Sequence, residues 1–390
     1  MTTSDGPDVA VVGAGAIGVT AAYDLTRRGA DVTLFERGTV ANGSSGRAAG
    51  VCYNAFAEDI DAEIGRRAIE RFRTLSGDDT FPFVECPYLW LARHDDHKRA
   101  TLIREAIPRM QELGVVALEV GSDELSDRFP WLRTDDVATA GIAGAAGYTD
   151  PARYTSCLAA AATGAGASLE TNTPVSVRDD PPRVIVHADG DDRILGGTRR
   201  NEDREFDAVL VAAGSHTGGI FAEAGIPIAT KPYRVQALTA VGEYPEPICY
   251  DATAGFYVRP HPTGILAGNG TECVEADPDT YDRDANPGFA DDLLDRVTRR
   301  IPDLKPELDR AWAGLCTASP DRDPLVGELR DGVYVATGFQ GHGFMRAPAI
   351  GERIADEIMG GEGIDAFDPT RFSGTEEFEI VEGMAVEERY

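Results

Sequence analysis

Glycines and one acidic residue near the N-terminus have the spacing of a dinucleotide-binding motif. Gly13, Gly15 and Gly18 follow a short apolar run at residues 8–13 and open a segment of helical periodicity. Glycine there allows a tight turn and lets backbone N–H groups approach a pyrophosphate at the helix N-terminus. Glu36 stands eighteen residues beyond Gly18, where a carboxylate accepts hydrogen bonds from the ribose hydroxyls of adenosine. The motif predicts a bound dinucleotide without choosing between NAD and FAD.

Three further segments are rich in small residues and extend this expected site. Residues 42–50 carry serines and glycines that suit a pyrophosphate and a flavin edge, although an ordinary Gly/Ser loop is the alternative. Residues 207–214 form an apolar strand that ends in small residues. Residues 338–348 place glycines before a helix that starts near Pro348, and the positive end of that helix would stabilise negative charge on a reduced flavin.

The residues expected to contact the cofactor come from these segments and from one strand between them. They are Gly13, Gly15, Ala16, Gly18, Glu36, Arg37, Ser44, Ser45, Arg47, Ala48, Ala49, Val175, Ala213, Gly214, Gly338, Gly341, His342, Gly343 and Phe344.

Candidate catalytic residues lie on a later strand and in the second glycine loop. Strand alternation places Tyr257, Arg259 and His261 on one face. Arg259 is suited to fork onto a substrate carboxylate, with a surface ion pair as the alternative. His342 is either catalytic or a structural histidine, and Arg346 faces either the pocket or solvent. The six cysteines form no CxxC pair, and no Cys/His spacing matches a zinc site, so no metal is expected.

The amino-acid composition limits the classes of molecule that the protein is expected to bind. A net charge of −29 argues against nucleic acid and anionic membranes, which need basic patches. Only Lys98, Lys231 and Lys305 are lysines, and acid excess with scarce lysine resembles the proteins of extreme halophiles; an acidic mesophilic enzyme is the alternative. No stretch of about 18 apolar residues predicts a membrane span, and the short polar N-terminus is unlike a signal peptide, so a cytoplasmic protein is expected.

Periodicity predicts the elements that hold these residues. The first 36 residues form a strand, a helix and a second strand, the unit that a Rossmann-type fold begins with. The charged segment 190–205 is expected to be a hairpin tip, and the lobes are expected to interleave. Helices are expected at 16–28, 61–75, 97–113, 151–163, 287–301 and 349–359, and strands at 31–35, 83–92, 173–177, 183–188, 207–213, 231–241, 255–268, 311–317 and 332–337.

The chain resembles the D-amino-acid-oxidase-like family of FAD enzymes, above all its sarcosine oxidase, glycine oxidase and dimethylglycine dehydrogenase group. The matching segments are 9–36, 43–50, 207–214, 319–327 and 338–348. The resemblance implies an α/β (α+β) fold in which a Rossmann-like FAD-binding domain is interleaved with a mixed-sheet substrate-binding domain. The implied boundaries are 1–82, 145–232 and 318–372 for the FAD-binding domain, 83–144 and 233–317 for the substrate domain, and 373–390 for an acidic C-terminal tail.

The same resemblance implies oxidation of the C–N bond of a small amino acid by hydride transfer to flavin N5. Sarcosine, glycine, dimethylglycine and D-amino acids are the expected substrate types, and His261 matches a family active-site histidine by position. A 2-hydroxy-acid dehydrogenase, which needs a base such as His261 or His342, is one alternative. A non-catalytic FAD-bearing scaffold or assembly factor is another. The expected electron acceptor is oxygen, a quinone or an electron-transfer protein. The sequence does not decide whether the enzyme has a partner subunit.

Several positions depart from the family pattern. Gly314 and Arg47 stand where some members tether flavin covalently through cysteine or histidine, which predicts non-covalent FAD. Cys316 replaces the carboxylate-binding arginine of glycine oxidases, and Met345 replaces a substrate-binding lysine of monomeric sarcosine oxidases. Tyr257 stands where those oxidases have the lysine that promotes reaction with oxygen, which favours a dehydrogenase.

Overall fold

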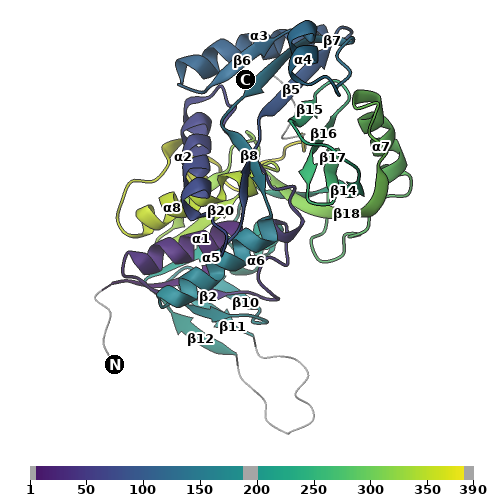
Figure 1. The fold of residues 1–390 in the computed structure, drawn as a ribbon. Helices are drawn as coiled ribbons and strands as arrows, with labels where there is room; N and C mark the ends of the chain where they lie inside the picture. The colour runs from purple at the N-terminus through teal and green to yellow at the C-terminus, as the bar shows by residue number, and fades with distance from the viewer. Residues whose placement is uncertain (1–5, 188–200, 382–390) are drawn as a thin grey trace.

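Two large β-sheets organise the chain (Figure 1). The computed structural model describes residues 6–187 and 201–381. The six-stranded sheet has the order β19 (Leu325–Arg330), β20 (Val333–Thr337), β13 (Ala208–Val211), β1 (Asp8–Val12), β2 (Asp31–Phe35), β9 (Ser168–Glu170). The eight-stranded sheet has the order β18 (Glu307–Ala318), β14 (Lys231–Val241), β17 (Gly264–Glu275), β16 (Phe256–His261), β15 (Ile248–Asp251), β5 (Tyr88–Arg93), β7 (Val137–Ala143), β6 (Ala117–Val120).

The six-stranded sheet is parallel except at β19 and is covered on both faces. Apolar side chains of β1 alternate between the two sides, as the period of a strand requires. Val9 and Val11 belong to a core with three helices, α1 (Ala16–Arg27), α5 (Pro151–Ala165) and α8 (Gly343–Ile358). Ala10 and Val12 face a second core, formed with α6 (Thr217–Ala224) and the small sheet of β10 (Val175–Arg178), β11 (Arg183–Val186) and β12 (Glu202–Glu205).

The eight-stranded sheet is mixed, with β15 and β5 parallel and the other pairs antiparallel. Helix α7 (Phe289–Arg300) packs on β16 and β17 through Leu293 and Val297. Helix α3 (His97–Glu112) packs against β5, β6 and β7, and the short helix α4 (Ser122–Arg128) lies beside β7. One face of this sheet is thus covered by helices, which leaves strands β14, β16, β17 and β18 to line the interior site described below.

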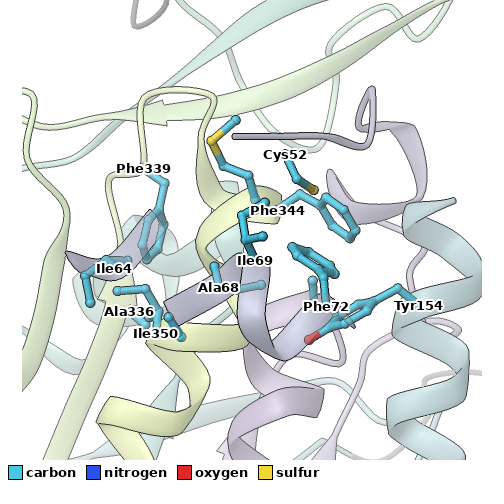
Figure 2. Packing of buried hydrophobic residues seen from close by; sticks show 14 of the residues in the cluster. Cys52, Ile64, Ala68, Ile69, Phe72, Tyr154, Ala336, Phe339, Phe344 and Ile350 are labelled. Carbon is cyan, nitrogen blue, oxygen red and sulfur yellow. The ribbon is translucent and has the colours of Figure 1, made fainter. Parts of the chain in front are cut away.

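Aromatic side chains pack between the helices near the start of α8. Helix α2 (Asp59–Leu75) brings Phe72 to 5.6 Å from Phe344 and to 5.3 Å from Tyr154, measured between ring centroids. Figure 2 shows these rings together with Cys52 and Ile69 in one apolar cluster. A three-stranded sheet is formed by β3 (Val51–Tyr53), β8 (Ala146–Thr149) and β4 (Phe83–Glu85). In the chain, β3 follows β2 of the six-stranded sheet, while β4 precedes β5 and β8 follows β7 of the eight-stranded sheet.

The α/β (α+β) fold class is confirmed by this arrangement and by solved structures reported below. The six-stranded sheet is built from segments assigned to the predicted FAD-binding domain, and the eight-stranded sheet mainly from those assigned to the predicted substrate domain. The domain boundaries themselves stay a prediction. Helix α5 begins as expected, because the Asp150 carboxylate accepts hydrogen bonds from the N–H groups of Ala152 and Arg153. No helix in the described ranges is long and apolar enough to cross a membrane.

Four expected elements differ from the structure. The strand expected at 255–268 is two antiparallel strands, β16 and β17. The single strand at 83–92 is two strands, because Pro87 has no N–H for a ladder, and β4 and β5 join different sheets. Part of the hairpin tip at 190–205 is strand β12, and residues 188–200 lie outside the described ranges. Helix α8 begins at Gly343, six residues before Ala349; Pro348 stays inside it, since proline near a helix start removes only one backbone hydrogen bond.

The start of the acidic C-terminal tail packs against the eight-stranded sheet. Ile380 is buried beside Tyr233 and Ala318, and Lys231 Nζ donates to the carbonyl oxygen of Phe378 at 2.8 Å. The first part of the expected acidic tail, up to Val381, is therefore held against the sheet, because apolar residues are interspersed with its acids. Residues 382–390 lie outside the described ranges.

Candidate functional site

A cavity of about 520 Å³ lies between the two large sheets. The turn after β1, the end of β2 and the start of α8 form one side of it. Strands β14, β16, β17 and β18 form the other side. The cavity therefore extends from the first glycine motif to the eight-stranded sheet, which is the shape that an extended dinucleotide with a reactive ring at one end requires.

The first glycine motif is held in a geometry that other residues do not adopt. Gly13 has a φ of +108°, and a Cβ atom there would lie 2.6 Å from the carbonyl oxygen of Ala212. A Cβ on Gly18 would lie 2.0 Å from the carbonyl oxygen of Gly13, so α1 packs directly on the turn. Ala16 N–H donates to Ser45 Oγ at 2.9 Å, which ties the serine loop to the N-terminus of α1. The helix N-terminus thus opens into the cavity.

Glu36 is fixed at the same end of the cavity. Its two carboxylate oxygens accept hydrogen bonds from Ala14 N–H at 2.9 Å and Gly38 N–H at 2.8 Å. A carboxylate has about four acceptor sites, so both oxygens retain capacity for ribose hydroxyls. The described residues at this end therefore fit the adenosine and pyrophosphate portions of a dinucleotide.

The second glycine loop brings the start of α8 into the cavity. Thr317 on β18 fastens this loop, because its Oγ1 accepts from Gly338 N–H at 3.1 Å and its carbonyl oxygen accepts from Gln340 N–H at 2.8 Å. Gly341 has a φ of +82°, which turns the chain into the helix. His342, Gly343 and the two residues after them line the cavity. The positive end of the α8 dipole therefore points at its occupant.

Most of the residues expected to contact the cofactor line this cavity, and two do not. Gly18 is excluded because it packs against Gly13, and Gly338 is excluded because it faces Ser319. Contact with the cofactor stays a prediction for the others. Those that line the cavity are Gly13, Gly15, Ala16, Glu36, Arg37, Ser44, Ser45, Arg47, Ala48, Ala49, Val175, Ala213, Gly214, Gly341, His342, Gly343 and Phe344.

Arg259 lies behind the cavity wall. Its side chain is 4% exposed, its Nε donates to the carbonyl oxygen of Ala49 at 2.6 Å, and its Nη1 donates to that of Pro260 at 2.6 Å. The guanidinium carbon lies 4.9 Å from the centre of the Tyr148 ring. Burial lowers the pKa of Arg259 to about 10, so the group is still charged at neutral pH. Since its donors are directed at backbone, the expected contact with a substrate carboxylate does not fit this placement.

His261 and Arg346, which were also expected to be catalytic, do not line the cavity, whereas Tyr257 does. The cavity reaches only the part of β16 near Tyr257, and His261 stands at the far end of that strand. There His261 Nδ1 forms a 2.9 Å hydrogen bond with Thr263 Oγ1. Arg346 is buried and pairs with Asp61, with 2.8 Å between Nη2 and Oδ1. Its position on α8 turns it toward α2 rather than toward the cavity.

Sequence reasoning missed Tyr53, which forms part of the cavity wall. Its hydroxyl lies 3.2 Å from His342 Nε2, and its ring stacks on Tyr88 at 4.1 Å between centroids. Tyr53 stands on a three-residue strand, too short for a periodic signal. Tyr233, Gln236, Asn269 and Thr271 from β14 and β17 were missed as well. Together with Tyr257, they give the end of the cavity away from Glu36 an aromatic and amide lining.

Comparison with known proteins identifies the family. Residues 8–357 match the family described as FAD dependent oxidoreductase (DAO). The chain belongs to this family. Its cofactor is FAD, which the glycine turn, Glu36 and the start of α8 are shaped to accept.

Members of the DAO family resemble the chain over nearly its whole length. Glycine oxidase of Geobacillus kaustophilus is 27% identical over 385 residues, covering 94% of this chain and 96% of the relative. Monomeric sarcosine oxidase of Streptomyces avermitilis is 27% identical over 401 residues, covering 94% and 98%. The crystal structure of L-proline dehydrogenase from P. horikoshii superimposes with a TM-score of 0.80 at 26% identity, covering 94% and 98%. The crystal structure of the G. kaustophilus glycine oxidase also gives a TM-score of 0.80, at 24% identity, and shows the shared fold.

Proposed function

We propose that this FAD-dependent enzyme oxidises the C–N bond of a small amino acid. The observation that carries the proposal is a cavity that runs from the glycine turn to a lining of tyrosines and amides. The relatives named for glycine, sarcosine and L-proline support the substrate class, because each resembles the chain over more than nine-tenths of its length.

FAD supplies the hydride acceptor when it is bound. Glu36 would hold the ribose, and the N–H of Gly15 together with Ser44 and Ser45 would hold the pyrophosphate. The N-terminus of α8 stabilises negative charge that develops on the flavin. Tyr257 and Tyr53 line the cavity at the end away from Glu36, where they would contact the substrate.

The lining of the cavity favours an amine as substrate. Burial of the substrate away from bulk solvent would favour the neutral form of an amine, whose lone pair assists departure of the hydride without a strong base. Burial raises the pKa of Tyr257, so its hydroxyl stays protonated and positions the substrate through a hydrogen bond. A 2-hydroxy acid would instead need a base to take its alcohol proton, and among the expected catalytic histidines only His342 lines the described cavity.

Arg47 is the arginine we assign to the substrate carboxylate. The arginines that line the described cavity are Arg37, Arg47 and Arg283. Arg37 pairs with Asp279 at the adenosine end, and Arg283 is exposed at the mouth. Arg47 directs Nη1 at the carbonyl oxygens of Asn42 and Gly43, which leaves its Nε and Nη2 to bind an anion.

We further propose that the electron acceptor is a quinone or an electron-transfer protein rather than oxygen. A fixed cation near the flavin lowers the barrier to forming superoxide. By the resemblance described above, Tyr257 is expected at the position of the lysine that serves this purpose in monomeric sarcosine oxidases, and tyrosine is neutral. In the described chain no lysine lines the cavity, and Arg259, two residues along the strand, is turned to the backbone of Ala49. Arg47 does line the cavity, but its charge is the one assigned above to the substrate carboxylate.

An anaerobic screen tests the proposed function. Glycine, sarcosine, dimethylglycine, L-proline and D-amino acids are each mixed with the oxidised holoenzyme, and the flavin absorption band is followed. Bleaching by one or more amino acids, but not by 2-hydroxy acids, is expected. Bleaching by 2-hydroxy acids alone would replace the proposal with the alcohol dehydrogenation. No bleaching by any compound, with FAD fully bound, would favour a non-catalytic scaffold.

A further inference from the structure

The segment 276–288, here called the strap, crosses from the eight-stranded sheet to the adenosine end of the cavity. It connects β17 to α7. Pro278, Asp279, Tyr281 and Arg283 of the strap line the same cavity as Glu36. A segment of the sheet opposite the glycine motif therefore reaches the part of the cavity that holds adenosine.

The base of the strap is held firmly by Arg234 of β14, which is 7% exposed. Its Nε donates to the carbonyl oxygen of Asp282 at 2.9 Å, and its Nη2 donates to that of Asp284 at 2.5 Å. Its Nη1 donates to Asn286 Oδ1 at 2.8 Å, and Asn286 N–H donates to Gln236 Oε1 at 2.6 Å. Buried charge-assisted hydrogen bonds of this kind are strong, so this part of the strap stays with its own sheet.

The tip of the strap is held across the cavity by Asp279. Its Oδ1 accepts from Arg37 Nη1 at 2.9 Å and lies 3.2 Å from His216 Nε2. Arg37 directly follows Glu36, and His216 lies close to β13 of the six-stranded sheet. The side chains of Arg37 and Asp279 are 49% and 66% exposed. Exposed ion pairs are weak, so the tip opens far more easily than the base.

We propose that Asp279 is a cofactor-retaining residue: its contacts with Arg37 and His216 close the strap over the adenosine end of FAD, and FAD leaves when they break. Because the base of the strap is held firmly and its tip weakly, the tip opens while the base stays in place. The contacts of the Asp279 carboxylate control that opening. This inference rests on FAD binding and not on the proposed substrate, so failure of the amino-acid screen does not affect it.

The test compares Asp279→Ala with Asp284→Ala. Both remove one negative charge from the strap, but Asp284 neither lines the cavity nor contacts Arg37 or His216. Holoenzyme is diluted, and the fluorescence of released FAD gives the dissociation rate, with no substrate present. Asp279→Ala is expected to raise this rate by about two- to fivefold, as the loss of exposed ion pairs implies, and Asp284→Ala to leave it unchanged.

A double-mutant cycle with Arg37→Gln supplies the second measurement. If Arg37 acts through Asp279, its substitution changes the dissociation rate less in the Asp279→Ala background than in the wild-type chain. Equal rates for Asp279→Ala and Asp284→Ala, or fully additive effects in the cycle, would overturn the proposal.

Discussion

The Nε of Arg259 lies 2.6 Å from the carbonyl oxygen of Ala49, so an arginine on the eight-stranded sheet supports the loop that lines the cavity. The guanidinium stays behind that loop, stacked on Tyr148. Arg259 therefore shapes the flavin site without reaching the substrate. This relationship separates its role from that of Arg47, which lines the cavity directly.

Replacing Arg259 with alanine is expected to weaken the fold and FAD binding while the KM of the loaded enzyme stays near its original value. The variant removes the donor of the part-buried carbonyl oxygen of Ala49, which costs on the order of 1 kcal/mol, and it also opens a void beside Tyr148. Thermal unfolding and titration of the apoprotein with FAD measure the two effects. Arg310→Ala, at an exposed arginine stacked on Trp312, is the control and should change stability by less than about 0.5 kcal/mol. A large rise in KM with normal FAD affinity would return Arg259 to substrate binding.

Replacing Arg47 with methionine is expected to raise KM strongly. Methionine retains much of the side-chain stem that packs over Gly314 but removes the charge that pairs with the substrate carboxylate. Loss of a charged hydrogen bond of about 1.5–3 kcal/mol corresponds to roughly a ten- to hundredfold fall in kcat/KM. Steady-state kinetics on enzyme with measured FAD occupancy tests this, with Arg283→Met as the matched arginine at the cavity mouth. An unchanged KM in fully loaded Arg47→Met would contradict the assignment.

FAD is expected to be released completely when the protein is denatured in acid. Gly314 offers no side chain to attach the flavin, and burial raises the pKa of the Cys316 thiol to about 11, so that thiol is protonated and a poor nucleophile at neutral pH. After precipitation and centrifugation, the yellow colour should be in the supernatant. Cys316→Ala should behave identically. Colour that stays in the pellet of the wild type and disappears in Cys316→Ala would show a covalent link.

Reduced enzyme is expected to react slowly with oxygen and quickly with an artificial acceptor. The reason is the neutral Tyr257 at the position where a cation would stabilise superoxide. Stopped-flow reoxidation in air-saturated buffer is compared with reoxidation by a dye or a quinone. Tyr257→Lys should increase the oxygen rate if the cation is the missing element. Reoxidation of the wild type by oxygen as fast as turnover would make the protein an oxidase.

The midpoint of thermal unfolding is expected to rise steeply with salt, and folding to require molar concentrations. The net charge of −29 opposes the compact state through self-repulsion. Salt screens this repulsion, because the Debye length falls from about 10 Å at 0.1 M to about 3 Å at 1 M. Unfolding is followed from 0.1 M to 3 M sodium chloride, with sucrose as an uncharged control for solute exclusion. A midpoint that does not respond to salt would remove the halophilic interpretation.

The cofactor end of the site was predictable from sequence because it depends on backbone geometry that few residues can adopt. Gly13 and Gly341 have positive φ values, and Glu36 stands at a fixed distance from the first turn. These requirements leave motifs of constant spacing. The sequence likewise predicted a helix starting at residue 151, where the Asp150 carboxylate caps α5.

The substrate end was less predictable because it depends on how separate elements meet. Alternation correctly indicated that Tyr257 and Arg259 share a face of β16, but it carries no information on where the cavity ends along that strand. Tyr53 belongs to a strand of three residues. Asp279 contacts Arg37 across 242 positions of sequence. No pattern within a single element encodes such contacts.

The pairing of β1 with β13 sets the order of events during synthesis. Val9 lies opposite Ala208, so the strand that leads into the glycine turn lacks this neighbour until residue 208 has left the ribosome. At about 5–20 residues per second, the apolar edge of β1 stays uncovered for on the order of ten seconds or longer. The N-terminus of α8 is made later still, from residue 343 onward. Flavin loading therefore waits until residue 343 and its neighbours have been made, long after the glycine turn itself.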